Sequence, residues 1–419
     1  SILRKSIPDI KAIILSGAFG RGEGNLKSHD YDLDVILAKS CKKEELKTIK
    51  DNLSKALLKE KKEIKRSCRG EELDIHFINK KTLSSLPALL RFYDMRYYSK
   101  VIYGKDLRKL MPRFRADDLS YYEGLRLLAN KLVYSMEWLD AEKIIRNNID
   151  KDLRDHLARD ITKMHVIACY ALLILIKKYQ GRIQDSMQVF EKTYKSSFAG
   201  LYERYPGLLE DIKHYSKIKL LSDFGKIKDV RKEWLRSLRM YLDVIRYYQE
   251  KSIGLKDWQD FAPMTCRYHL MGILDAIFTD KAGLINNRLT KRMANLSAQY
   301  YQNIQGFKKI LRKKGKINLK SLTNFKDPNI ILYSACIFIM LQIADCSIEK
   351  GYMDKAIRLL EKINIVRADK KHKGINRLVK QAYSTFRIYT EHGTVYDSQD
   401  IRFILKVESS LIKNFSRLK

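Results

Sequence analysis

The sequence contains little proline, and that little is unevenly spread. Six prolines occur among 419 residues, and only Pro206 and Pro263 lie between residues 113 and 327. Proline removes a backbone donor and interrupts helices, so this long stretch with few prolines predicts a mostly helical region. Apolar residues at helical spacing support the same interpretation, including a helical hairpin over 330–361 that turns near Gly351.

Paired cysteines and long apolar runs are also missing. The six cysteines are scattered without any Cys-x-x-Cys, so no zinc spacing is visible, and the pattern favours a reducing, cytoplasmic setting. Cys169 and Cys336 lie in apolar helical stretches, and we expect both to be buried thiols. The longest apolar runs, 166–176 and 330–344, are shorter than the roughly 20 residues that cross a bilayer. We therefore expect no transmembrane segment.

Acidic residues are scarce relative to basic ones. Lys and Arg number 82 against 49 Asp and Glu, which gives a formal net charge of +33. Such an excess predicts a polyanionic partner, with RNA or DNA as the first choice and an anionic membrane as the second, although a generally basic surface is the alternative. Basic residues are densest over 308–316, recur at 370–373, and alternate with tyrosines in the segment 83–115, which includes Arg91.

The most informative stretch is AIILSGAFGRGEGNLKSHDYDLDVIL, residues 12–37. Its apolar ends, 13–15 and 35–37, predict two strands, and four glycines followed by three alternating aspartates lie between them. Residues two apart share one face of a strand, so Asp32 and Asp34 would present two carboxylates side by side. Oxygen ligands of this kind hold Mg²⁺, and a glycine-rich turn lets backbone N–H groups approach a phosphate. The stretch therefore predicts a site for a metal and a triphosphate.

Other glycine-loop motifs do not match these residues. No Gly-Lys-Ser/Thr follows the glycines, which excludes a P-loop, and Asn25 stands where a dinucleotide-binding fingerprint needs its last glycine. A further strand is expected at 73–78, and a closing strand with its turn at 101–107. A charged helix over 42–65 separates the second strand from the third, which predicts a strand–strand–helix–strand core.

The order of these residues resembles the nucleotidyltransferase superfamily of DNA polymerase beta. The motif of that superfamily is an apolar strand, Gly-Ser, a spacer, and then Asp-apolar-Asp/Glu-apolar. Here Gly17-Ala18 is followed by Asp32-Leu33-Asp34-Val35. The superfamily places a third carboxylate on a neighbouring strand, and Asp74 matches it. The resemblance covers only the N-terminal part of the chain.

This resemblance implies an α+β fold, in which a small nucleotidyltransferase mixed sheet with flanking helices precedes a large all-α region. It implies transfer of a nucleoside monophosphate from an NTP, with ATP as the expected nucleotide, by two Mg²⁺ ions. The residues it implies are Asp32, Asp34 and Asp74 for catalysis and metal binding, and Gly17, Ala18 and Arg21 for the nucleotide phosphates.

Some assignments stay open at this stage. Ala18 stands where the family has serine, which removes one phosphate contact, although Ser16 is nearby. Asp30 and Asp32 are an alternative metal pair, but the apolar run directly after Asp34 favours Asp32 and Asp34. We expect His76 to share the face of Asp74, either near the substrate or as a partly buried strand residue.

Two further residues are weaker candidates for nucleotide binding. Asn130 and Lys131 form a polar pair inside a predicted helix over 119–139, and helices after such catalytic cores often reach back to the nucleotide. Ordinary exposed helix positions are the alternative. Glu23 is expected to fix the glycine turn by hydrogen bonds rather than to bind metal.

The domain prediction follows from Pro112 and the change to helical patterning. We expect a catalytic domain over 1–112, a helical domain packed on it over 113–260, and a C-terminal helical domain over 261–419. The function predicted is nucleotidyl transfer to an RNA 3′ end. The alternatives are transfer to a small-molecule or protein hydroxyl, and an inactive nucleotidyltransferase fold that binds RNA or serves as a scaffold.

Overall fold

The computed structural model describes residues 10–24, 31–38, 73–86, 88–253, 328–346, 350–363 and 374–390. The chain divides into two compact units, and within the described residues the boundary between them falls between Arg115 and Ala116. This boundary lies close to the one predicted at 112. The division predicted at 260 lies outside the described residues, as do the basic runs at 308–316 and 370–373 and the helix expected over 42–65.

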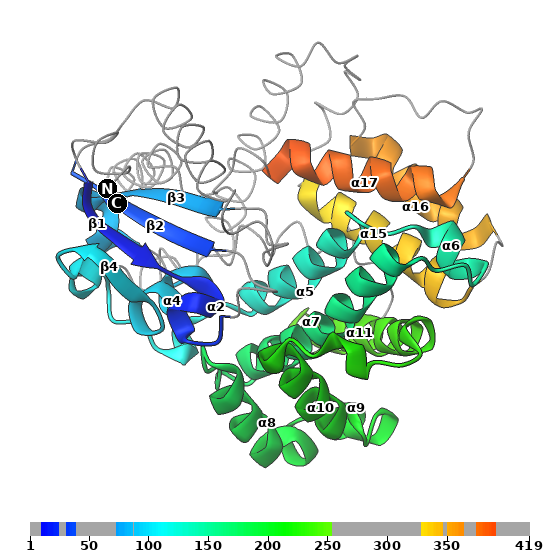
Figure 1. Cartoon of the computed structure of the whole chain (residues 1–419), viewed down its shortest axis with the longest axis horizontal. Coiled ribbons are helices and arrows are strands. Elements are labelled where there is room, and N and C mark those ends of the chain that lie inside the picture. Colours follow the sequence, from blue (N-terminus) through cyan, green and yellow to red (C-terminus); the bar gives the residue numbers. More distant parts are fainter. Residues whose placement is uncertain are drawn as a thin grey trace, which may run out of the picture. The chain divides into compact units, whose positions relative to one another are not determined.

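The first unit is built on a four-stranded sheet in the order β3-β2-β1-β4 (Figure 1). The strands are β1 (Ile10–Leu15), β2 (Tyr31–Leu37), β3 (Leu73–Asn79) and β4 (Lys100–Gly104). β1 pairs antiparallel with β2 and β4, whereas β2 pairs parallel with β3, so the sheet is mixed. All four expected strands are present, and β4 is the strand part of the strand and turn expected over 101–107. A small mixed sheet beside many helices makes the fold class α+β.

The two faces of β2 have different surroundings. Leu33, Val35 and Leu37 point to one face, where they form a buried cluster with Ile13 and Ile75. Side chains alternate along a strand, so the aspartates at 32 and 34 lie on the opposite face. The apolar cluster thus fixes the register of β2, because a slip of one residue would bury the aspartates in that cluster.

Short helices complete the described part of the first unit. They are α2 (Gly17–Arg21), α4 (Leu90–Tyr97), and 3₁₀ helices at Lys80–Ser85 and Leu107–Leu110. α2 is the glycine turn of the sequence, folded into about one turn of helix that ends at Gly22 with φ 80°. Glycine suits this C-terminal position because it adopts left-handed dihedrals without steric cost.

Every regular element longer than three residues in the described part of the second unit is an α-helix. These helices are α5 (Tyr121–Ser135), α6 (Ala141–Ile145), α7 (Lys151–Leu175), α8 (Ile183–Ser197), α9 (Ala199–Arg204), α10 (Leu208–Leu221), α11 (Val230–Ile253), α15 (Pro328–Ala344), α16 (Lys350–Ile363) and α17 (Ile375–Thr390). The hairpin predicted over 330–361 is present as α15 and α16. The turn was predicted near Gly351; α15 ends at Ala344 and α16 begins at Lys350, so the connection between the two helices ends just before this residue.

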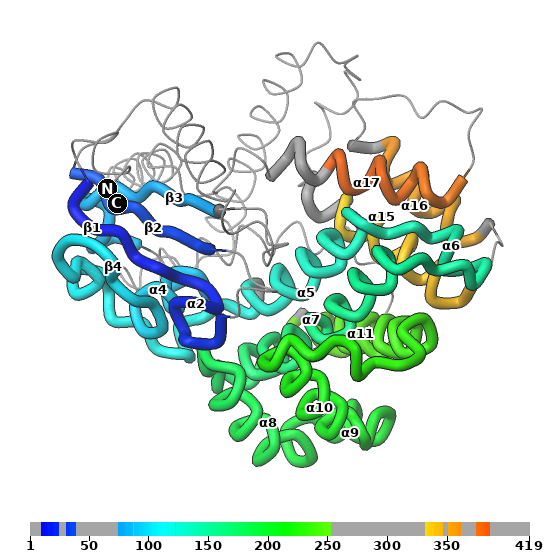
Figure 2. Tube along the Cα trace, in the orientation of Figure 1, coloured from blue at the N-terminus to red at the C-terminus, as the bar shows by residue number. Residues whose placement is uncertain are grey.

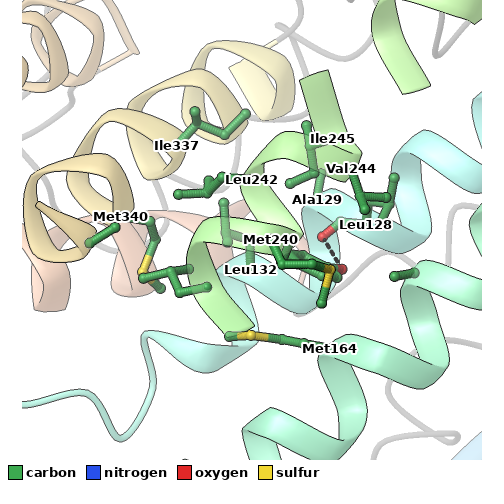
Figure 3. Close-up of a cluster of buried hydrophobic side chains, with 14 of the residues drawn as sticks. Leu128, Ala129, Leu132, Met164, Met240, Leu242, Val244, Ile245, Ile337 and Met340 are labelled. Carbon is green, nitrogen blue, oxygen red and sulfur yellow. Dashed lines mark hydrogen bonds between the residues drawn. The ribbon is translucent and has the colours of Figure 1, made fainter. Parts of the chain in front are cut away.

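One apolar core joins helices that are far apart in the sequence. α15 packs against α5, α11, α16 and α17, and these helices can be followed along the trace in Figure 2. Figure 3 shows part of this core, formed by Leu128, Ala129, Leu132, Met164, Met240, Leu242, Val244, Ile245, Ile337 and Met340. α15 is apolar around its whole circumference, which is typical of a helix buried on all sides. Among the described helices, none has both the length and the apolar character that a bilayer crossing needs.

Candidate active site

The glycine turn packs directly onto Asp32. The backbone N–H of Ser16 donates to the carbonyl of Asp32 over 2.9 Å, which joins the end of β1 to the start of β2. Gly17 follows with φ 61°, and a Cβ placed on it would lie 1.7 Å from Oδ2 of Asp32. Only glycine fits between this backbone and the carboxylate. The glycine turn therefore lies directly against Asp32, and its approach to a phosphate stays a prediction.

The parallel pairing of β2 with β3 sets the positions of the other carboxylates. Asp32 is the register partner of Asp74, and Asp34 is the partner of His76. Register partners on adjacent strands point to the same face and lie about 4.7–4.9 Å apart. The structure thus brings Asp32, Asp34 and Asp74 together on one face of the sheet. The expectation that His76 shares the face of Asp74 is confirmed.

Asp34 is a buried carboxylate with two donors. It is 1 % exposed. The hydroxyl of Ser16 donates to Oδ2 over 2.5 Å, and the guanidinium of Arg91, from α4, forms an ion pair with Oδ1. A buried carboxylate is stable only with such partners. In the sequence Arg91 belongs only to a basic, tyrosine-rich segment, and no pattern there predicts this contact.

Asp32, Asp34, Asp74 and His76 form one array of side chains on this face of the sheet. Asp74 and His76 are its outer half. The Asp74 side chain is 48 % exposed, and Nε2 of His76 lies 2.9 Å from its Oδ2. Nδ1 of His76 is buried and, within the described part of the chain, has no hydrogen-bond partner. This half of the array is therefore open to solvent at Asp74, in contrast to the enclosed Asp34.

These residues fit a divalent cation in part. Two carboxylates in register, Asp32 and Asp74, provide the hard oxygen ligands that Mg²⁺ prefers. Asp34 lies on the same face, but its oxygens contact Ser16 and Arg91. Within the described ranges, no three histidine, cysteine or acidic side chains come close enough together to hold a metal ion. In the structure Asp34 is thus held by protein groups.

The predicted phosphate-binding residues on α2 lie at the same turn. Gly17 and Ala18 begin this helix, where the first N–H groups have no acceptor within the helix. Arg21 donates to Glu23 over 2.9 Å and to Asp94 over 3.3 Å. The expectation that Glu23 fixes the turn by hydrogen bonds is confirmed.

The weaker candidates, Asn130 and Lys131, belong to the second, helical unit. Lys131 is 6 % exposed; its ammonium donates to Ser135 over 2.8 Å and forms an ion pair with Asp160. Burial lowers the pKa of Lys131, and Asp160 opposes that shift. The Asn130 side chain accepts a hydrogen bond from the hydroxyl of Tyr333. These contacts tie α5 to α7 and α15, and a role in nucleotide binding stays a prediction for both residues.

The fold and this array define an α+β protein with clustered carboxylates beneath a glycine turn. No protein-family model matches the chain, and no curated protein matches it closely enough to count as a relative.

Proposed function

We propose that this protein is a metal-dependent nucleotidyltransferase that moves a nucleoside monophosphate from an NTP, with ATP as the expected donor, to the 3′ hydroxyl of an RNA. The observation that carries the proposal is the register of Asp32 with Asp74 on the face covered by Gly17. An arrangement of carboxylates beside a tightly approaching backbone suits a nucleotide tail held with a hard cation.

Each residue has a stated task in this proposal. Asp32 and Asp74 would hold Mg²⁺. When bound, this ion would lower the pKa of the acceptor hydroxyl and neutralise charge on the phosphates. Gly17 and Ala18 present the backbone of α2 beside Asp32. Ser16 holds the Asp34 carboxylate in place through its 2.5 Å hydrogen bond. Positioning and charge neutralisation dominate catalysis of phosphate transfer, so these are the tasks that the reaction class requires of the protein.

The choice of RNA as acceptor is supported by charge. A net charge of +33 attracts a polyanion far more than it attracts a neutral small molecule or a protein hydroxyl. Exposed aromatic side chains at Tyr97 and Tyr103 accompany this charge in the first unit, at 43 % and 38 % exposure. Such rings stack on unpaired bases, so they suit a single-stranded 3′ end.

The test is transfer of label from each α-labelled NTP, with Mg²⁺, to total RNA. Asp32→Asn and Asp74→Asn should each lower transfer at least about a hundredfold, because each removes a charge that the transition state requires. Asp106→Asn is the matched control: Asp106 is a partly exposed acid of the same unit that pairs with Arg108. It should transfer label like the wild type.

The destination of the label separates the alternatives. Label on RNA that disappears with either aspartate variant supports the proposal. Label on the protein itself or on a small molecule would show that the acceptor is not RNA, while the reaction would still be nucleotidyl transfer. Equal transfer by the wild type and both aspartate variants would refute the site.

A second candidate function is RNA binding by an inactive nucleotidyltransferase fold. The observation that favours it is the engagement of Asp34 by Ser16 and Arg91, which leaves this carboxylate bound to protein groups. In that case no nucleotide is transferred from an NTP at any Mg²⁺ concentration, and the affinity of the protein for RNA falls steeply as the salt concentration rises.

A further inference from the structure

Arg91 puts a fixed positive charge on the most buried carboxylate of the site. The guanidinium comes from the first turn of α4 and pairs with Oδ1 of Asp34, whose side chain is 2 % exposed. The Arg91 side chain is 26 % exposed, and its guanidinium carbon lies 5.9 Å from the ring centroid of Phe92. The arginine is thus anchored at one end and partly open to solvent.

Asp34 is also a neighbour of the two carboxylates that would hold a metal. It lies two residues along β2 from Asp32, and Asp32 is in register with Asp74. Three carboxylates on one face repel one another, and a cation between them relieves that repulsion. Arg91 supplies one unit of positive charge at Asp34, where a divalent ion would supply two.

We propose that Arg91 and a divalent cation compete for Asp34, so that Arg91 sets the metal concentration at which the site becomes complete. The inference rests on the proposed function and concerns the regulation of that same site. A carboxylate has about four lone-pair sites, so hydrogen-bond geometry alone leaves room for both partners. Charge decides the competition, because a guanidinium and a divalent ion on one buried carboxylate repel each other strongly.

The competition also accounts for the contrast between the two halves of the array. Asp74 is 48 % exposed, so a hydrated ion reaches it together with Asp32. Asp34 is enclosed and receives its second donor from Ser16 over 2.5 Å. A first ion would then bind at Asp32 and Asp74, and recruitment of Asp34 requires Arg91 to leave.

The experiment measures metal binding by the full chain without any nucleotide or RNA. Mn²⁺ binding is followed by electron paramagnetic resonance and Mg²⁺ binding by calorimetry, at constant ionic strength. Arg91→Met should bind the ion about tenfold more tightly, because the competing charge is gone. Arg91→Lys keeps the charge and should bind like the wild type. Lys105→Met removes an exposed charge of the same unit and should also leave binding unchanged.

A second pair of variants ties the effect to Asp34. In Arg91→Met combined with Asp34→Asn, the gain in affinity should disappear, because the released carboxylate is no longer there. Circular dichroism and thermal unfolding show whether each variant is folded. If Arg91→Met does not fold, Asp34→Asn alone gives the decisive comparison: metal affinity should then fall less than threefold, since Arg91 already excludes Asp34 from the wild-type site.

The outcomes separate the inference from the proposed function. Equal or weaker metal binding by folded Arg91→Met, or a loss well above threefold in Asp34→Asn, would overturn the competition while leaving the nucleotidyltransferase proposal intact. No metal binding by the wild type or by any variant would overturn both. Tighter binding by Arg91→Met that vanishes in the double variant supports the inference.

Discussion

Replacement of Gly17 by alanine is the sharpest probe of the site geometry. The φ of 61° at this position costs an alanine about 1–2 kcal/mol. The new methyl group would also lie 1.7 Å from Oδ2 of Asp32, so either the carboxylate or the turn must move. Overpacking of this kind costs about 1–3 kcal/mol more. We therefore expect Gly17→Ala to destabilise the first unit by about 2–5 kcal/mol.

Gly22 offers a matched control within the same turn. Its φ is 80°, and a Cβ placed on it would have only Nζ of Lys100 nearby, at 4.0 Å. Gly22→Ala thus carries the backbone cost without the clash. The difference between the two variants isolates the contact with Asp32, about 1–3 kcal/mol, or roughly 5–150-fold in the equilibrium constant for local opening.

Hydrogen exchange followed by mass spectrometry measures this difference locally. Tryptophan fluorescence does not serve, because all three tryptophans of the chain lie beyond residue 137, outside the first unit's sheet. Peptides covering 10–24 and 31–38 should exchange faster in Gly17→Ala than in Gly22→Ala. Adding Asp32→Ser to Gly17→Ala should bring exchange back to the Gly22→Ala level. Equal exchange in the two glycine variants would refute the placement of Asp32 beneath Gly17.

Three further predictions concern the helical unit. Burial lowers the pKa of His165 to about 4, so the unfolded chain binds more protons below the ordinary value of 6.5. Stability should fall by about 1.4 kcal/mol per pH unit from pH 6.5 towards 4, and His165→Asn should remove this slope in thermal unfolding. Asp160→Asn leaves the ammonium of Lys131 buried without its counter-charge and should cost about 3 kcal/mol in urea unfolding, whereas Lys131→Met should cost less. Burial raises the pKa of the Cys169 and Cys336 thiols, so iodoacetamide at pH 8 should modify both only after unfolding, as mass spectrometry of peptides would report.

The sheet was predictable because local patterns determine it. The apolar runs at 13–15 and 35–37 form strands, and the alternation of Asp32 and Asp34 with Leu33 and Val35 separates a polar face from a buried one. The resemblance to the nucleotidyltransferase superfamily also implied that Asp74 lies on a strand next to that of Asp32, whereas the register that pairs the two residues was not predicted. The glycine turn was recognised, but its folding into the helix α2 depends on the hydrogen bonds around it.

The partners of the charged side chains were not predictable in the same way. Arg91 meets Asp34 across 57 residues, and Asn130 meets Tyr333 across 203. No periodicity in the sequence encodes such a contact, since it depends on how separate elements pack. For the same reason Lys131 looks like a surface or ligand-binding residue in the sequence, while the fold buries it beside Asp160.

The position of α15 within its unit has a consequence for biosynthesis. A chain synthesised as far as residue 253 has completed α5, α7 and α11, but their apolar sides have not yet met Ile337 and Met340. Until α15 leaves the ribosome, the nascent protein exposes that apolar surface to the cell. A version truncated after Ile253 should therefore bind chaperones or form inclusion bodies. Co-expression with the fragment 328–390 should restore soluble expression of the truncated protein.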